Sequence, residues 1–115
     1  MLHMTYVLDC PDPRELAAFY AALLDTGIQD EDDDWATLTG IPGATIAFQR
    51  SPEHRPSTWP APDVQQMAHL DFLVADRGAA HAKAIALGAK VLDDAPANFT
   101  VYADPAGHPF CLCQE

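Results

Sequence analysis

The chain has 115 residues, of which 49% are hydrophobic, so it can bury the core of one small domain but cannot hold separate cofactor and catalytic domains. Six basic against 17 acidic residues give a formal net charge of −11, which disfavours nucleic acid and anionic membrane surfaces as partners. We see no membrane span, no signal peptide and no disulfide spacing among the three cysteines, and we therefore expect a reducing, cytoplasmic location.

The first part of the chain predicts a strand, a helix and three further strands. A strand over residues 5–9 precedes Asp12, a helix N-cap followed by proline at the first helical position. Apolar residues recur from Leu16 at intervals of three, four and seven, which predicts one apolar helix face, and Gly27 is expected to close the helix region. Short strands are expected at 28–30, 35–39 and 44–50.

The acidic run at residues 30–34 could bind a cation, but consecutive carboxylates on a turn diverge, and we interpret the run as a solvated turn. Residues 51–66 are rich in proline and lack periodicity, which predicts a linker or an ordered surface loop. A strand at 68–75 and a helix capped by Asp76 follow. The last strands are expected at 90–92, 99–103 and 109–113.

The two parts repeat the same pattern. An offset of 64 residues aligns Asp12 with Asp76 and Gly43 with Gly107. Two copies of such a unit indicate a duplicated supersecondary structure rather than a solenoid. We therefore predict an α+β fold of two βαβββ modules in a single domain over 1–115, with module one at about 1–50, a linker at 51–66 and module two at about 67–115.

Alternation of side chains along the strands predicts two different sheet faces. One face is apolar in four of the strands and should pack on the two helices. The other face is mixed and could line a pocket that binds a small molecule. Its residues include Thr5, Asp9, Ala47, Gln49, His69, Asp71, Cys111 and Cys113.

Several motifs together resemble the vicinal oxygen chelate superfamily, the glyoxalase, bleomycin-resistance and dioxygenase fold. They are LDCPDP at 8–13, LAAFY at 16–20, AFQ at 47–49, HLDF at 69–72, ALGA at 86–89 and DPAGHPF at 104–110. The resemblance covers nearly the whole chain and is closest to the glyoxalase-like branch. It implies a cup-shaped mixed sheet with helices on the outer face, and a homodimer.

The resemblance also implies where a divalent metal would bind. Metal enzymes of the superfamily use His, Glu or Gln side chains from the first and last strand of each module. Those positions fall here on Thr5, Ala47, His69 and Cys111. Only His69 is a standard ligand, and Ala47 has no donor atom, so the metal site is degenerate.

Each candidate residue also has a structural interpretation. His69 could bind a ligand, act as a general base, or simply pair with Asp71. Cys111 and Cys113 could bind zinc or be small core-like residues, and they are too close along one strand to form a disulfide readily. Trp35 is expected in the core, Trp59 as an anchor of the loop or part of a lid, and Asp104 and His108 in a turn.

Three functional hypotheses follow. The first is metal-independent binding of a small molecule by Thr5, Ala47, Gln49, His69, Asp71, Cys111 and Cys113, with no cofactor. The second is a lyase, isomerase or dioxygenase with a divalent metal at His69 and Cys111, with Gln49 as a further ligand. The third is a metal-free enzyme in which His69 is the general base, assisted by Cys111 or Asp71.

Overall fold

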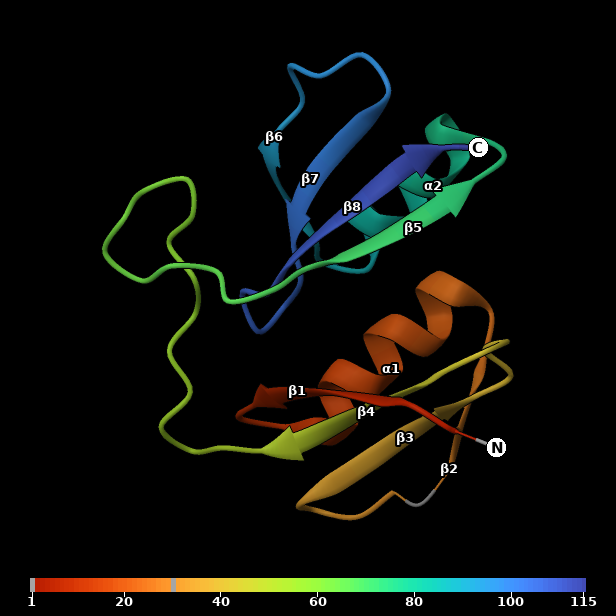
Figure 1. Ribbon diagram of the computed structural model, residues 1–115, viewed down its shortest axis with the longest axis vertical. Helices are drawn as coiled ribbons and strands as arrows, with labels where there is room; N and C mark the ends of the chain where they lie inside the picture. The colour runs from red at the N-terminus through yellow and green to blue at the C-terminus, as the bar shows by residue number, and fades with distance from the viewer. Residues whose placement is uncertain (1, 30) are drawn as a thin grey trace. The chain divides into compact units, whose positions relative to one another are not determined.

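The structure is a computed structural model that describes residues 2–29 and 31–115 (Figure 1). Asp30, which the sequence placed in a strand, lies outside the described residues. The elements, in chain order, are β1 (Thr5–Cys10), α1 (Pro13–Leu24), β2 (Gly27–Gln29), β3 (Trp35–Thr39), β4 (Thr45–Arg50), β5 (Leu70–Val74), α2 (Arg77–Ala86), β6 (Lys90–Asp93), β7 (Phe99–Ala103) and β8 (Pro109–Gln114). None of the described helices is long and apolar enough to cross a membrane.

The strands form two four-stranded mixed sheets. The order in the first sheet is β1-β4-β3-β2, and the order in the second is β5-β8-β7-β6. In both sheets the first strand pairs in parallel with the last, and the other neighbours are antiparallel. This identical topology confirms the two predicted βαβββ modules.

Two compact units contain the two sheets, Met1–His54 and Arg55–Glu115. The boundary falls inside the predicted linker. Part of that segment is ordered by its own contacts, because the backbone N–H of Thr58 donates to the Val64 carbonyl at 2.8 Å and the N–H of Val64 donates to the Thr58 hydroxyl at 2.8 Å. Trp59 is half-buried, and its backbone N–H donates to the Ser57 hydroxyl at 3.1 Å.

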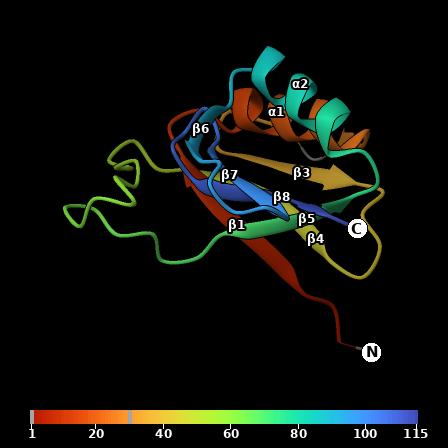
Figure 2. The same ribbon diagram turned by 90° about the horizontal axis from the view of Figure 1, so that it is seen from above.

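Both helices begin where their N-caps were predicted. The Asp12 carboxylate accepts from the N–H of Glu15 at 3.2 Å, and the Asp76 carboxylate accepts from the N–H of Ala79 at 3.0 Å. Each bond satisfies one of the N–H groups that the first helical turn leaves without a partner. The helices then lie on the apolar face of their own sheets, α1 on β3 and β4 and α2 on β8 (Figure 2).

The end of α1 differs from the prediction. The helix ends at Leu24, and Asp25, not Gly27, takes the left-handed cap conformation, with φ of 54°. Aspartate tolerates this conformation better than most residues. Gly27 instead begins β2, where a Cβ would lie 2.6 Å from the Thr39 hydroxyl, so the glycine permits close approach of two strands.

Stacked aromatic rings occupy the core of each unit. The Tyr20 ring on α1 stacks on Phe48 with ring centroids 5.7 Å apart, and both side chains are fully buried. In the second unit, Tyr102 and Phe110 stack at 5.2 Å. Burial of the large rings supplies much of the hydrophobic stabilisation of such small sheets.

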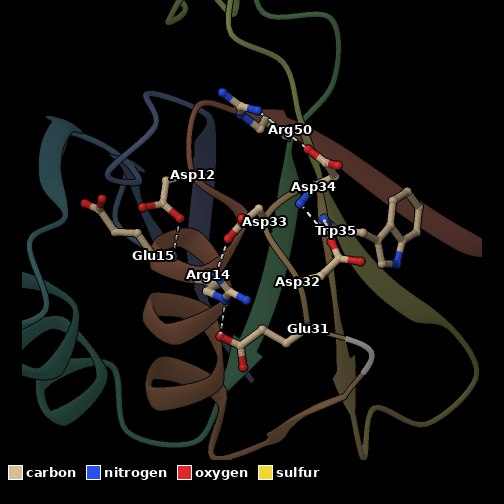
Figure 3. A network of polar contacts seen from close by, with 9 residues as sticks. All are labelled: Asp12, Arg14, Glu15, Glu31, Asp32, Asp33, Asp34, Trp35 and Arg50. Carbon is tan, nitrogen blue, oxygen red and sulfur yellow. Dashed lines mark hydrogen bonds and ion pairs between the residues drawn. The ribbon is translucent and has the colours of Figure 1, made fainter.

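The acidic run forms an ion-paired turn in front of β3 (Figure 3). The Asp32 carboxylate accepts from the N–H groups of Asp34 and Trp35 at 2.7 and 2.8 Å. Arg14 of α1 pairs with Glu31 at 3.2 Å and also with Asp33. These contacts support the interpretation of the run as a turn.

The turn between β7 and β8 is held by one buried carboxylate. Asp104 is 4% exposed and accepts from the N–H groups of Ala106 and His108 at 2.8 and 3.0 Å. Gly107 has φ of +87°, and a Cβ there would lie 2.4 Å from the Cβ of Pro56. The predicted turn roles of Asp104 and His108 are confirmed.

Candidate functional site

The mixed face of the first sheet carries three of the predicted site residues. Thr5 pairs with Thr45, and Ala47 and Gln49 lie two and four positions further along β4, on the same side. Thr5 and Gln49 are exposed, whereas Ala47 is completely buried. This face therefore offers a hydroxyl and an amide, but Ala47 presents only a methyl group.

Trp35 also lies on this face, and its expected place in the core is wrong. It is the β3 partner of Gln49, while its neighbour Ala36 pairs with the buried Phe48 on the helix side. The half-buried indole donates its N–H to the Thr37 hydroxyl at 2.8 Å and points away from α1 (Figure 3). Strand alternation places the ring here despite its hydrophobicity.

The second sheet brings four predicted residues together. Asp71 on β5 pairs with Cys111 on β8, and Leu73 pairs with Cys113, so these side chains share the face opposite α2. His69 lies one residue before β5, because this strand begins at Leu70 rather than at 68 as predicted. Cys111 is 5% exposed, Cys113 is half-buried, and His69 and Asp71 are exposed.

A compact polar cluster results, formed by His69, Asp71 and Cys111. The His69 Nε2 lies 3.3 Å from the Asp71 Oδ1. The donor atoms of all three residues lie within 4.8 Å of one another. One carboxylate thus faces both an imidazole and a thiol.

The cluster keeps its thiol protonated. Burial, followed by the hydrogen bond and the negative charge of Asp71, raises the pKa of the Cys111 thiol from 9.0 to about 12. Burial and Asp71 also raise the pKa of Cys113, against an opposing effect of Arg77. Cys111 is therefore a neutral hydrogen-bond donor to Asp71 near neutral pH, not a nucleophilic thiolate.

The metal site that the family resemblance implies does not fit these residues. Of its four positions, Ala47 has no donor atom and Thr5 offers only a neutral hydroxyl. Asp71, which the resemblance does not place among the ligands, is instead the third donor beside His69 and Cys111. The donor atoms thus come from the second module alone.

Two aromatic side chains beside these residues were not among the predicted site residues. Trp35 is the strand partner of Gln49, and Phe99 is the strand partner of Cys113. The 64-residue offset aligns Trp35 with Phe99, and strand alternation could have placed both side chains on the mixed face. Phe99 is 37% exposed.

A pocket of about 520 Å³ also lies in the first unit. None of the predicted site residues is among those that line it. It is formed around the turn between β3 and β4.

A comparison with protein families identifies the family of this chain. The family model described as "Glyoxalase-like domain" matches residues 5–113. A comparison with curated proteins finds no match. Among solved structures, a glyoxalase/bleomycin resistance protein/dioxygenase family enzyme from Burkholderia phytofirmans is similar, with a TM-score of 0.75, 17% identity and coverage of 96% of this chain and 95% of that one.

Two further solved structures share the fold. A possible glyoxalase from Bacillus cereus has a TM-score of 0.72 and 13% identity, with 98% of each chain covered. A bleomycin-binding protein from Streptomyces verticillus, complexed with copper(II)-bleomycin, has a TM-score of 0.62 and 16% identity, with 100% of this chain and 97% of that chain covered. From the match over residues 5–113 and the paired βαβββ modules, we conclude that this chain belongs to the glyoxalase-like domain family, within the vicinal oxygen chelate superfamily.

Proposed function

We propose that the protein binds a small, partly apolar molecule without a metal ion, and that the face of β5 and β8 opposite α2 carries the binding residues. The observation that carries this proposal is the cluster of His69, Asp71 and Cys111, in which the pKa of the thiol is raised to about 12. A protonated thiol is a neutral hydrogen-bond donor, and a metal ion would have to displace its proton to bind. Of the positions that should complete a metal site in the first module, Ala47 has no donor atom and Thr5 offers only a neutral hydroxyl.

The surroundings of the cluster favour a ligand with an apolar part. Leu73 and Phe99 lie on the same face, 68% and 37% exposed. Covering such side chains would contribute about 25 cal/mol for each Å² removed from water. Asp71 can accept a hydrogen bond from an amine, amide or hydroxyl of the ligand, and His69 can donate or accept.

The family supports this class of function. The bleomycin-binding protein from Streptomyces verticillus has the same fold and binds a small molecule. On the first sheet, we propose that Thr5, Ala47 and Gln49 contribute to ligand binding as well. We further propose a homodimer, by analogy with the family, and a cytoplasmic location, consistent with three cysteines that are all free thiols.

A ligand screen with matched variants tests the proposal. Small molecules that raise the melting temperature of the wild-type protein would be titrated by calorimetry into His69→Ala and Asp71→Asn. Removal of one partner of a hydrogen bond to the ligand should weaken binding by about tenfold. His54→Ala, in the other unit, is the control and should bind like wild type. Equal affinity for all four proteins would show that the cluster does not bind the ligand.

The donor distances favour metal binding as a second candidate function. Imidazole, carboxylate and thiol groups within 4.8 Å of one another could hold a zinc ion if the thiol lost its proton. Zinc affinity would then rise steeply with pH, since the thiol proton must be displaced. Calorimetric titration of zinc into wild type and Cys111→Ala tests this candidate function. Zinc affinity should fall in Cys111→Ala if the cluster binds the ion, and it should be the same in both proteins if the cluster does not.

The third hypothesis, with His69 as a general base, stays a prediction. The 3.3 Å contact with Asp71 is the arrangement that would orient its imidazole. If His69 is the general base, His69→Ala should abolish any activity detected with a ligand from the screen.

A further inference from the structure

The pocket in the first unit is large enough for a small organic molecule. Its volume is about 520 Å³, within the range of roughly 300–1,000 Å³ that small-molecule sites occupy. Its walls come from the segment before β1, the ends of β2 and β3, and the turn that joins β3 to β4. None of these lining residues belongs to the cluster of His69, Asp71 and Cys111.

One hydrogen bond fixes the wall that the segment before β1 contributes. The Nε2 of His3 lies 2.6 Å from the hydroxyl of Thr45, the first residue of β4. This bond is in addition to the one that the N–H of Thr45 donates to the Met4 carbonyl at 2.9 Å. The two contacts hold the segment and the strand together at the edge of the pocket.

Two glycines lie in the turn that lines the pocket. Gly40 and Gly43 have φ of 79° and 82°, a conformation that residues with a Cβ rarely adopt. A Cβ at either position would meet nothing within 4 Å. The positive φ, rather than a lack of space, therefore favours glycine at both positions.

The lining combines polar and apolar side chains. The described residues around the pocket provide the hydroxyls of Thr39 and Thr45, the amide of Gln29 and the imidazole of His3. The apolar part of the wall comes from Leu2, Leu38 and Ile41. None of the described lining residues is Asp, Glu, Lys or Arg, although the chain has a net charge of −11.

These features define the kind of ligand. A charged group bound there would find no Asp, Glu, Lys or Arg among the described lining residues to pair with. An anion would in addition be repelled by the net charge of the protein. We propose that this pocket is a second binding site, for a small uncharged molecule that carries an amide, carbonyl or hydroxyl group on an apolar body. The proposal goes beyond the function assigned to His69, Asp71 and Cys111 and does not depend on it.

Three probes of similar shape and different charge test the class of ligand. Benzamide, benzoate and benzylamine would each be titrated into isotope-labelled protein and followed by the backbone amide resonances. Benzamide should shift the resonances of Gly40, Gly43 and Thr45 in a saturable manner, and it should bind at least about fivefold more tightly than either ion. Tighter binding of benzoate or benzylamine, or no saturable shift of these resonances with any probe, would overturn the proposal.

Variants locate the site. Ile41→Trp should fill the pocket and abolish the benzamide shifts, and Ala61→Trp, in the exposed loop of the second unit, should leave them intact. Thr45→Val removes the hydroxyl with little change in volume and should weaken benzamide about fivefold. Dispersed amide spectra would confirm that each variant is folded. Unchanged benzamide affinity in Ile41→Trp would place the probe elsewhere and refute the site.

Discussion

Replacing Asp71 with asparagine should make Cys111 react faster with alkylating reagents. The pKa of Cys111 is raised from 9.0 to about 12, which leaves about a thousandfold less thiolate near neutral pH than an unperturbed thiol would have. Burial is the largest cause and persists in the variant. Asp71 acts both as hydrogen-bond acceptor and as a negative charge, and its removal should raise the thiolate fraction by about tenfold.

The rate of alkylation by iodoacetamide, measured for each cysteine by peptide mass spectrometry, reads this effect directly. Cys113 should accelerate as well, because Asp71 also raises its pKa. Cys10, which is buried in the first unit, should not respond. Asp94→Asn, an exposed carboxylate of the second unit, is the matched control. Equal rates at Cys111 in wild type and Asp71→Asn would refute the hydrogen-bonded cluster.

Four further predictions concern stability. The pKa of Cys111 is about 12 in the folded protein and ordinarily 9.0, so the unfolded chain loses this proton first as the pH rises. The stabilisation is therefore present below pH 9.0 and is lost as the pH rises towards 12. Cys111→Ala should show a shallower fall in the free energy of unfolding over that pH range, measured by urea denaturation. Tyr20→Ala should lower the free energy of unfolding by about 3–5 kcal/mol, because its ring is fully buried, and a loss below about 1 kcal/mol in the same measurement would contradict its place in the core. Gly107→Ala should cost at least about 1 kcal/mol, since φ is +87° and a Cβ would lie 2.4 Å from Pro56. In contrast, Gly78→Ala in α2, where a Cβ meets only the Asp76 carboxylate at 3.5 Å, should stabilise the protein by about 0.5–1 kcal/mol. Thermal unfolding of Gly107→Ala and Gly78→Ala measures both effects, and a higher melting temperature for Gly107→Ala or a lower one for Gly78→Ala would contradict these predictions.

Local signals in the sequence were sufficient to predict the fold. N-caps at Asp12 and Asp76 marked the helix starts, and strand alternation separated the helix-facing residues from the mixed face. The same order of elements in both parts then indicated a duplicated unit. The end of α1 was missed because an aspartate in the left-handed conformation replaced the expected glycine cap.

The candidate site was predicted only in part. Strand alternation correctly placed Asp71 beside Cys111 and Cys113 on one face. Hydrophobicity suggested that Trp35 belongs to the core, but alternation along β3 directs it to the other face, and the indole N–H is satisfied by Thr37. The altered pKa of Cys111 could not be predicted, because it depends on the burial of the thiol and on the distance to a carboxylate forty residues away in the sequence.

The pocket around the turn between β3 and β4 was also beyond prediction from the sequence. It requires the segment that contains His3 to meet Thr45, a long-range contact within the first unit. Sequence periodicity reports the faces of individual elements, not the spaces that several elements enclose.

The metal content of the protein tests most directly whether this member of the family binds its ligand without a metal ion. Freshly purified wild-type protein, His69→Ala and Cys111→Ala would be analysed by elemental mass spectrometry, with Cys113→Ala as the matched control. We predict far less than one metal ion per chain in all four proteins, and the same thermal stability before and after treatment with a chelator. About one ion per wild-type chain, lost in His69→Ala and Cys111→Ala but kept in Cys113→Ala, would contradict the account and establish a metal centre at the cluster.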